Sequence, residues 1–321
     1  MKFKNIIQIA GIIDQPEADL LMQCGVEWLG FPLRLSVNRE DLSEDEAAVV
    51  IRNIPSPHVP VLITYLDRAA DIAEFCGRLG VGMVQLHGAI AISEITELKS
   101  IAPSLQIIKS LIVRGDNLAQ LLEALVDYAL YVDAFITDTF DPATGASGAT
   151  GKVHDWSISR ELVENSSKPI ILAGGLTPEN VRAAILSVRP AGVDAHTGVE
   201  ALNGRKGPER VWRFVTEARE AFRQLDRDEE YDNDIDPEVP VDGVLDLHTF
   251  SPKEVKDLVP EYIRACREKG IYQIRIIHGK GTGTLRRTVQ ALLDRSTEVE
   301  SYATADGPGG GWGATLVVLR R

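Results

Sequence analysis

The stretches ILAGGLTPENV (Ile171–Val181) and GVDAHTGVE (Gly192–Glu200) decide the fold of this chain. Each runs from an apolar strand through small residues into the start of a helix. Gly174, Gly175 and the pair Thr197–Gly198 leave backbone N–H groups accessible, and two such turns side by side form a cup of donors that suits a phosphate. In a (β/α)8 barrel this cup follows strands 7 and 8 at the catalytic face. The alternative is that these glycines only permit tight turns.

The same alternation of strands and helices extends over residues 5–224. Near-continuous apolar strands that alternate with amphipathic helices favour a parallel sheet closed into a TIM barrel. A doubly wound open sheet is the alternative, but no GxGxxG follows the first strand. Thr177 is expected to cap a helix with Pro178 at its first position, and Asp155 another that begins at Trp156. The predicted strands are Ile6–Ala10, Glu27–Phe31, Val59–Tyr65, Gly82–His87, Leu105–Val113, Val132–Asp138, Pro169–Ala173 and Ala191–Thr197.

The charge of the chain is unevenly spread over its 321 residues, whose net charge is −13. Residues 1–225 carry 21 basic and 29 acidic side chains, residues 226–242 carry one arginine and nine acids, and residues 243–321 carry 12 basic and nine acidic side chains. We therefore predict an acidic barrel over 1–225, an extended solvated linker over 226–242, and a second domain over 243–321. Only that last domain, with its positive net charge, suits a nucleic acid.

Hydropathy and cysteine usage point to a cytoplasmic protein. No apolar run has the length of a membrane span, and the opening MKFKNIIQIAGIID is interpreted as a first strand rather than a signal peptide. The three cysteines are scattered, which favours neither a disulfide framework nor a metal site. We expect no contact with a membrane and no cofactor for the barrel. The sequence leaves open the oligomeric state and whether the second domain uses a divalent metal.

Residues 5–224 resemble phosphoribosylanthranilate isomerase, a TIM barrel of tryptophan biosynthesis. The resemblance implies a phosphorylated sugar-type substrate and an Amadori aldose-to-ketose isomerisation, which is an intramolecular oxidoreduction. The matching segments, in family order, are QIAGI (8–12), LGF (29–31), VQLHG (84–88), TDT (137–139), GKVHDWS (151–157), ILAGGLTPENV (171–181) and VDAHTGVE (193–200).

The resemblance identifies an acid and a missing base for this reaction. It implies that Asp138, at the end of strand 6, protonates the furanose ring oxygen as the ring opens. The family takes the proton from the second sugar carbon with a cysteine in strand 1, where this chain has Ala10. Gln8 likewise replaces a lysine, and the arginine that follows strand 2 in the family matches Arg39. Because alanine cannot accept a proton, the family mechanism cannot operate unchanged.

His196 is the predicted substitute base. It stands where the family has serine, and the period of a strand predicts that it shares a face with Asp194, which the family directs toward the site. Strand 8 pairs with strand 1 in a closed barrel, so we expect His196 near Ala10. The alternative is a His196 that only hydrogen-bonds a phosphate, Asp194 or the backbone.

Three further features of the barrel carry weaker predictions. His87 is expected either to line the site or to be structural. Lys109 is expected to offset charge beneath the substrate or to pair with an acid such as Asp138. The glycine-rich loop Thr144–Lys152 is interpreted as a lid or as a loop without function.

Residues 243–321 begin a new α/β unit. The segments VLDLHTFSPKEV (244–255), IRIIHGKGTGTLRRTV (274–289) and GGGWGATLVVL (309–319) resemble the Smr (small MutS-related) domain, whose members bind nucleic acid and in several cases cleave DNA or RNA. We predict a small α/β sandwich with the strands Gly243–His248, Tyr272–His278, Val299–Ala303 and Ala314–Leu319 and the helices Pro252–Lys269 and Leu285–Asp294. His248 and His278 are the predicted proton-transfer groups, and Asp246 is expected to orient a histidine or to bind a metal. The predicted phosphate contacts are Gly279, Lys280, Gly281, Gly283, Arg286 and Arg287. The alternative is a structural HGKG turn without cleavage.

Two hypotheses for the whole chain follow. In the first, an isomerase barrel carries a nucleic-acid module. In the second, a non-catalytic barrel senses a phosphorylated metabolite and regulates the Smr module. A third, a nuclease with a structural barrel, leaves the phosphate cup unexplained.

Overall fold

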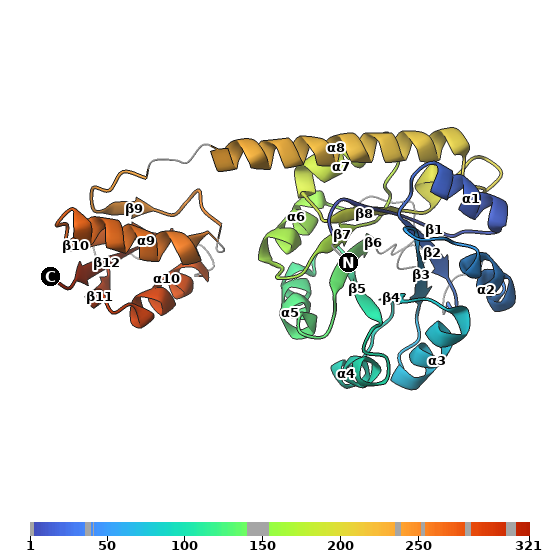
Figure 1. Ribbon diagram of the computed structural model, residues 1–321, viewed down its shortest axis with the longest axis horizontal. Helices are drawn as coiled ribbons and strands as arrows, with labels where there is room; N and C mark the ends of the chain where they lie inside the picture. Colours follow the sequence, from blue (N-terminus) through green and yellow to red (C-terminus); the bar gives the residue numbers. More distant parts are fainter. Residues whose placement is uncertain are drawn as a thin grey trace. The chain divides into compact units, whose positions relative to one another are not determined.

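The computed structural model describes residues 3–35, 40, 42–139, 154–234, 239–251, 254–279, 284–305 and 313–321 (Figure 1). The chain divides into two compact units, Met1–Asp232 and Asn233–Arg321. This division falls inside the predicted linker. Within the described residues, no helix is both long and apolar enough to cross a membrane.

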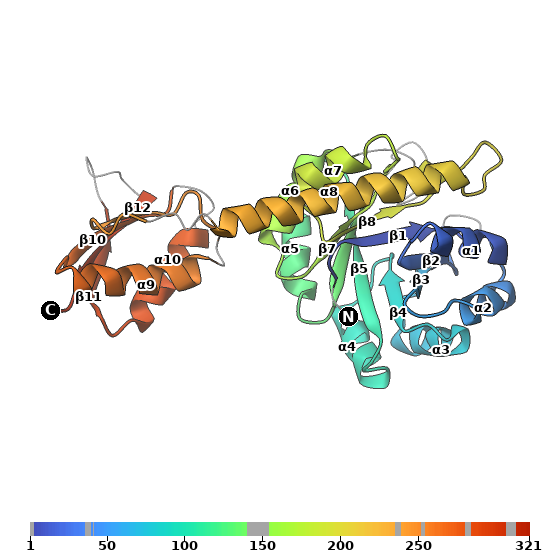
Figure 2. The ribbon, with the colours of Figure 1, turned by 45° about the horizontal axis from the view of Figure 1, so that its top comes forward.

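The first unit is a closed barrel of eight parallel strands in sequential order, with helices around the ring (Figures 1 and 2). Strand β1 pairs with β2 on one side and with β8 on the other, which closes the ring. This confirms the TIM barrel. Its strands are β1 (Ile6–Ala10), β2 (Trp28–Pro32), β3 (Val59–Thr64), β4 (Met83–Leu86), β5 (Gln106–Val113), β6 (Ala134–Thr139), β7 (Ile170–Leu172) and β8 (Gly192–Ala195).

The helices of the barrel follow the strands as expected. Asp155 caps α6 by accepting a hydrogen bond from the Ser157 N–H at 2.9 Å, as predicted. The helices are α1 (Gln15–Gln23), α2 (Glu44–Arg52), α3 (Ala69–Leu79), α4 (Ile92–Ile101), α5 (Leu118–Tyr128), α6 (Trp156–Asn165), α7 (Val181–Val188) and α8 (Pro208–Asp234), with the 3-10 turn η1 (Thr197–Val199) between β8 and α8.

Along each strand of the barrel, successive side chains belong alternately to two apolar layers. One set fills the barrel and the other packs against the helices, as the period of two requires. The inner layer consists of Ile6, Trp28, Val61, Met83, Ile108, Ala134, Ile136, Ile171 and Ala173. The outer layer includes Ile7, Ile9, Leu29, Leu62, Val84, Ile107, Leu111, Phe135, Leu172 and Val193. The inward series of β1, β6 and β8 continues toward the carboxyl ends with Ala10, Asp138 and Asp194.

The predicted extended linker begins as a helix. Residues 226–234 continue α8, whereas residues 235–238 lie outside the described part of the chain. Extending an existing helix by one residue avoids the cost of nucleation, so even this acidic segment propagates it. Asp226 also pairs with Lys4 at 2.8 Å and accepts a hydrogen bond from Asn5 at 2.9 Å, which anchors the helix to the start of the barrel.

The second unit is a four-stranded sheet packed against two helices. Its order is β11-β12-β10-β9, with β9 and β10 parallel and the other pairs antiparallel. Leu245, Ile276 and Val317 from the sheet form one core with Val259 and Ile263. The elements are β9 (Val244–Asp246), α9 (Val255–Glu268), β10 (Gln273–Ile277), α10 (Thr284–Arg295), β11 (Val299–Thr304) and β12 (Ala314–Leu319), which confirms the predicted order.

Candidate active site of the barrel and polar cluster of the second unit

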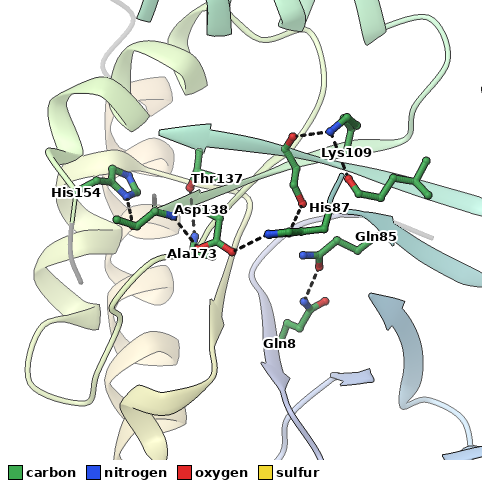
Figure 3. A network of polar contacts seen from close by, with 11 residues as sticks. Gln8, Gln85, His87, Lys109, Thr137, Asp138, His154 and Ala173 are labelled. Carbon is green, nitrogen blue, oxygen red and sulfur yellow. Dashed lines mark hydrogen bonds and ion pairs between the residues drawn. The ribbon is translucent and has the colours of Figure 1, made fainter. Parts of the chain in front are cut away.

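Asp138 lies at the carboxyl end of β6 and is buried. One carboxylate oxygen, Oδ1, accepts the Thr139 N–H at 2.7 Å, and the other lies 4.0 Å from Nε2 of His87 (Figure 3). Burial raises the pKa of Asp138 to about 7, and the Thr139 hydrogen bond opposes only part of that rise. A carboxyl with this pKa holds a proton for a large fraction of the time at neutral pH, as a general acid must.

His87 connects Asp138 to strand β5. Its Nδ1 lies 3.0 Å from Oγ of Ser110, and its ring meets that of Tyr65 edge to face at a centroid distance of 4.9 Å. Tyr65 follows β3, and burial together with the charge of Asp138 raises its pKa to about 12. It is therefore a neutral phenol beside the acid. His87 was among the predicted site residues and Tyr65 was not; the one signal for Tyr65 in the sequence was its place at the end of a predicted strand.

The prediction that Lys109 pairs with an acid such as Asp138 is wrong. The ammonium donates to the carbonyl oxygens of Ser110 at 2.9 Å and Leu86 at 3.4 Å (Figure 3). It lies 5.9 Å from the ring centre of Tyr128 on α5. Strand alternation explains this, because its neighbours Ile108 and Ser110 point into the barrel and Lys109 points to the helices. Burial lowers the pKa of Lys109 to about 8.

Asp194 and Gln8 occupy paired positions on β8 and β1. Gln8 donates from Nε2 to Oε1 of Gln85 at 3.1 Å, which ties β1 to β4 across the barrel (Figure 3). Burial and the charge of Asp138 raise the pKa of Asp194 to about 7, whereas Gln8 and Lys206 lower it. The two carboxyl groups therefore share one electrostatic environment at the mouth of the barrel.

His196 lies near Ala10, as predicted: it directly follows β8, whose last residue, Ala195, is the Cα partner of Ile9. The imidazole covers Gly11, where an added Cβ would overlap Nε2. The left-handed φ of 77° at Gly11 and this close approach both require glycine.

The surroundings of His196 disfavour its protonated form. Its Nε2 lies 3.6 Å from Glu200, but the buried Lys206 ammonium donates to the Glu200 carboxylate at 2.9 Å and to the His196 carbonyl at 3.3 Å. Burial and the Lys206 charge lower the pKa of His196 to about 3. The imidazole is neutral at physiological pH and a weak proton acceptor.

The turn after β7 packs against side chains from the end of β6 and the start of α6. Gly174 and Gly175 have φ values of 102° and 62°, and an added Cβ at Gly174 would overlap Oγ1 of Thr139. That hydroxyl lies 2.9 Å from Nδ1 of His154, whose Nε2 lies 2.6 Å from Oγ of Ser159. Burial lowers the pKa of His154 to about 4. A neutral histidine relay from β6 to α6 thus supports this turn (Figure 3 labels His154).

The turns after β7 and β8 lie against each other, as the sequence predicted. An added Cβ at Gly198 would overlap the Leu176 carbonyl oxygen. The helix predicted to begin at Pro178 begins three residues later: the Thr177 N–H donates to Oδ1 of Asn180 at 2.8 Å, and the Asn180 amide donates to the Gly175 carbonyl at 3.0 Å. This side-chain turn replaces the first helical turn.

In the second unit, Asp246 and His248 form a close pair. Nδ1 of His248 lies 2.6 Å from Oδ1 of Asp246, whose pKa is lowered by the backbone and side-chain hydrogen bonds from His248. Both side chains are exposed, and Nε2 of His248 faces Gly279, where an added Cβ would lie 3.1 Å away. The aspartate therefore orients a histidine, one of its two predicted roles. Within the described residues, no cluster of metal ligands occurs.

His278 is differently placed. It is buried, with Nδ1 3.1 Å from the Gly279 carbonyl and Nε2 3.0 Å from Oγ1 of Thr315. Because both ring nitrogens have partners within the unit, His278 fits a structural role better than the predicted proton transfer. Arg286 is half-buried and donates to Thr304 at 3.2 Å, whereas Arg287 is exposed.

Several predicted residues lie outside the described part of the chain. They are Arg39, the loop Thr144–Lys152, Lys280, Gly281 and Gly283.

Comparison with known proteins agrees with both resemblances. Residues 29–217 match the family described as N-(5'-phosphoribosyl)anthranilate (PRA) isomerase, and residues 245–320 match the Smr domain. N-(5'-phosphoribosyl)anthranilate isomerase 2 of Methanosarcina mazei is 40% identical over 217 residues, which cover 67% of this chain and 95% of that protein. The enzyme of Methanothrix thermoacetophila is 33% identical over 66% of this chain and 97% of its own length.

Solved structures give the same result. Phosphoribosyl anthranilate isomerase from Thermotoga maritima superposes with a TM-score of 0.57 at 27% identity, covering 67% of this chain and 98% of that one. A phosphoribosyl anthranilate isomerase in complex with reduced 1-(o-carboxyphenylamino)-1-deoxyribulose 5-phosphate superposes with a TM-score of 0.55 at 26% identity over the same shares. This chain therefore belongs to the N-(5'-phosphoribosyl)anthranilate isomerase family and carries an Smr domain after its barrel.

Proposed function

We propose that the barrel isomerises phosphoribosylanthranilate to the corresponding 1-amino-1-deoxyketose phosphate. The observation that carries this proposal is the buried Asp138, whose pKa of about 7 suits an acid that protonates a sugar ring oxygen. A family member in the solved structures holds a reduced analogue of such a ketose phosphate. No cofactor is required, because the oxidation of one sugar carbon and the reduction of its neighbour occur within one molecule.

The phosphate is assigned to the paired turns after β7 and β8. Gly174 and Gly175 in one turn, and Thr197 and Gly198 in the other, keep backbone amides close to the mouth. Because these turns lie next to the carboxyl ends of β6 and β8, a phosphate bound there leaves the sugar carbons near Asp138. His87, on the opposite side of Asp138, would hold the acid in place.

The base that the sequence predicted, His196, fits the reaction less well. A general base works best when its pKa lies near the working pH, and the pKa of His196 is about 3. Its place in the turn after β8, with neutral imidazole beside Gly11, suits contact with the substrate instead. The two carboxyl groups at the mouth have the better-matched pKa values.

The isomerase proposal is tested with the purified full chain and phosphoribosylanthranilate. We expect turnover by the wild type and a loss of about 10²–10⁴-fold in kcat for Asp138→Asn. The matched control is Asp71→Asn, which removes an exposed carboxylate on α3. A wild type that binds the reduced ketose phosphate but does not turn over would support the metabolite-sensing alternative and overturn the proposal.

We further propose that the Smr module binds nucleic acid and that the Asp246–His248 pair is its hydrolytic group. The supporting observation is the 2.6 Å contact, which fixes the proton on Nδ1 and directs Nε2 toward the Gly279 turn, where a backbone phosphate would lie. Residues 243–321 carry three more basic than acidic side chains, so binding should weaken steeply with salt.

The test uses the full chain with labelled RNA and DNA of the same sequence at low and high salt. His248→Asn should abolish cleavage and leave binding intact, whereas His278→Asn should lower the melting temperature of the module. Cleavage that survives in the His248 variant would exclude the pair. Absence of retardation of either nucleic acid at low salt would contradict binding.

A further inference from the structure

We propose that Asp194 is the general base that takes the proton from the second sugar carbon, in place of the thiol absent at Ala10. This inference rests on the proposed isomerase function and completes it, because it assigns the second of the two groups that the reaction needs.

The register of the barrel places Asp194 beside Gln8, two residues before the vacant position on β1. Gln8 is the Cα partner of Asp194 across the β1–β8 pair, and Ala10 lies two residues further along the same inward face of β1. The methyl group of Ala10 is buried, and an added Cβ at Gly30 would lie only 2.9 Å from it. Small groups of β1 and β2 therefore meet at the position of the absent thiol, and the neighbouring strand β8 supplies the Asp194 carboxylate beside Gln8.

One oxygen of Asp194 has no hydrogen-bond partner within the part of the chain that the structure describes. Among the described residues, Oδ1 of Asp194 is buried without a hydrogen-bond donor, and so is Oε1 of Gln8. A buried acceptor that is left unpaired is destabilising, so such atoms are uncommon unless a ligand uses them. Oδ1 of Asp194 and Oε1 of Gln8 therefore both lack a hydrogen-bond donor at neighbouring positions of β8 and β1. The hydroxyl and amino groups of an aminosugar phosphate, or the proton that a base removes, would satisfy them.

The charges around Asp194 adjust its proton affinity from several elements. Asp138 on β6 and burial disfavour the carboxylate, whereas Gln8 on β1 and Lys206 before α8 favour it. His196, in the turn after β8, is neutral, and Glu200 is paired with Lys206. The resulting pKa of about 7 makes Asp194 a stronger proton acceptor than His196 and leaves much of it ionised at neutral pH.

The proton transfers balance over one cycle. Asp138 gives its proton to the ring oxygen as the C1–O bond breaks, and the nitrogen lone pair forms the C1=N iminium. The Asp194 carboxylate then removes the proton from C2; the C–H electron pair forms C1=C2, and the C=N pair returns to nitrogen. When the enolamine becomes the ketone, the C2 hydroxyl proton returns to Asp138 and the proton on Asp194 passes to C1. Both carboxyl groups end in their starting states.

The test compares variants of the full chain in steady-state turnover of phosphoribosylanthranilate. Asp194→Asn should lower kcat by about 10²–10⁴-fold with a small change in KM, and His196→Asn should lower it less than tenfold. The reduced ketose phosphate should still bind to Asp194→Asn, and thermal melting should show that this variant is folded. Asp71→Asn again serves as the matched carboxylate control.

A second variant separates catalysis from binding. Adding Ala10→Cys to Asp194→Asn places a thiol at the vacant position. The kcat of this double variant should be at least ten times that of Asp194→Asn alone. The wild-type kcat/KM should rise as Asp194 loses its proton and fall as Asp138 loses its own, with a maximum near pH 7. In the rescued variant the rising limb should move toward about pH 8.5, the ordinary pKa of a thiol.

The outcomes distinguish the two proposals. A wild type without turnover overturns the isomerase function and this assignment with it. An active wild type whose Asp194→Asn variant keeps kcat within tenfold, or whose His196→Asn variant loses more than Asp194→Asn, overturns only the assignment to Asp194. Failure of Asp194→Asn to bind the reduced ketose phosphate would make Asp194 a binding residue and would also overturn it.

Discussion

At the residue scale, the burial of Asp138 lowers the stability of the folded chain while it gives the carboxyl the pKa of a general acid. Its carboxyl is buried at the end of β6, and the pKa of about 7 means that the folded chain holds this proton more tightly than the unfolded chain does. Between the unfolded value of 3.8 and about 7 the folded state binds more protons, so stability falls as pH rises through this window. Above pH 7 the carboxyl is ionised in both states, and the free energy of unfolding stays lowered by the burial of the charge.

Replacing this carboxyl should therefore stabilise the barrel. We expect Asp138→Asn to raise the melting temperature of the barrel by about 3 °C or more at pH 8, with the difference disappearing below pH 4. Thermal unfolding monitored by circular dichroism at both pH values provides the measurement, and Asp71→Asn is the control. An equal shift at pH 4 and pH 8 would mean that the effect comes from packing and not from charge.

The residues that the sequence placed correctly follow strand ends, and those it misplaced depend on strand parity. Asp138 and Asp194 could be assigned to the mouth because each lies near the carboxyl end of its strand. The acid pairing predicted for Lys109 was wrong, since the direction of its side chain depends on which of its neighbours enters the barrel. Strand β8 ends at Ala195, two residues earlier than predicted, so His196 follows the strand and does not lie within it.

At the element scale, the turns after β7 and β8 are built as one unit. The packing of Gly198 on the Leu176 carbonyl, with the Thr139–His154 relay beneath Gly174, fixes both turns against each other. The strands themselves were predicted to within one or two residues. The delayed start of α7 was not, because it depends on the Asn180 side chain, which competes with the helix for the same backbone groups.

A methyl group at Gly198 should separate these turns. We expect Gly198→Ala to raise KM for phosphoribosylanthranilate at least tenfold and to change kcat less, because the overlap displaces the phosphate turns and leaves Asp138 in place. Gly207→Ala is the matched control, since its added Cβ would lie 3.5 Å or more from its neighbours. Steady-state kinetics of the two variants makes the comparison; equal KM values would show that the paired turns do not hold the phosphate.

At the scale of the whole molecule, the two units have separate apolar cores. The barrel residues form an inner and an outer layer, and the residues of the second unit form a third cluster of their own. Composition predicted this division, because the acidic segment separates two stretches that are each rich in apolar periodicity. It did not predict that α8 continues into that segment as far as Asp234, since this extension starts from a helix that is already formed in the barrel.

Separate cores should unfold separately. We expect two thermal transitions for the full chain, of which the reduced ketose phosphate raises only the one that belongs to the barrel. At 100 times its Kd the ligand should add about 2.7 kcal/mol to the stability of that unit. Differential scanning calorimetry with and without the ligand measures both transitions. A single transition that shifts as a whole would show that the units unfold as one cooperative body.

The pairing of β1 with β8 also bears on how function is lost and regained. A ring of strands has no first member in space, so positions 8 and 194, far apart along the chain, are direct neighbours. A side chain lost from one strand can be compensated by the strand that closes the ring, without any change of backbone. The set of chemical groups around the ring therefore indicates whether such a barrel can catalyse a reaction better than the residue at any one aligned position does. An alanine at position 10 does not by itself mark an inactive enzyme.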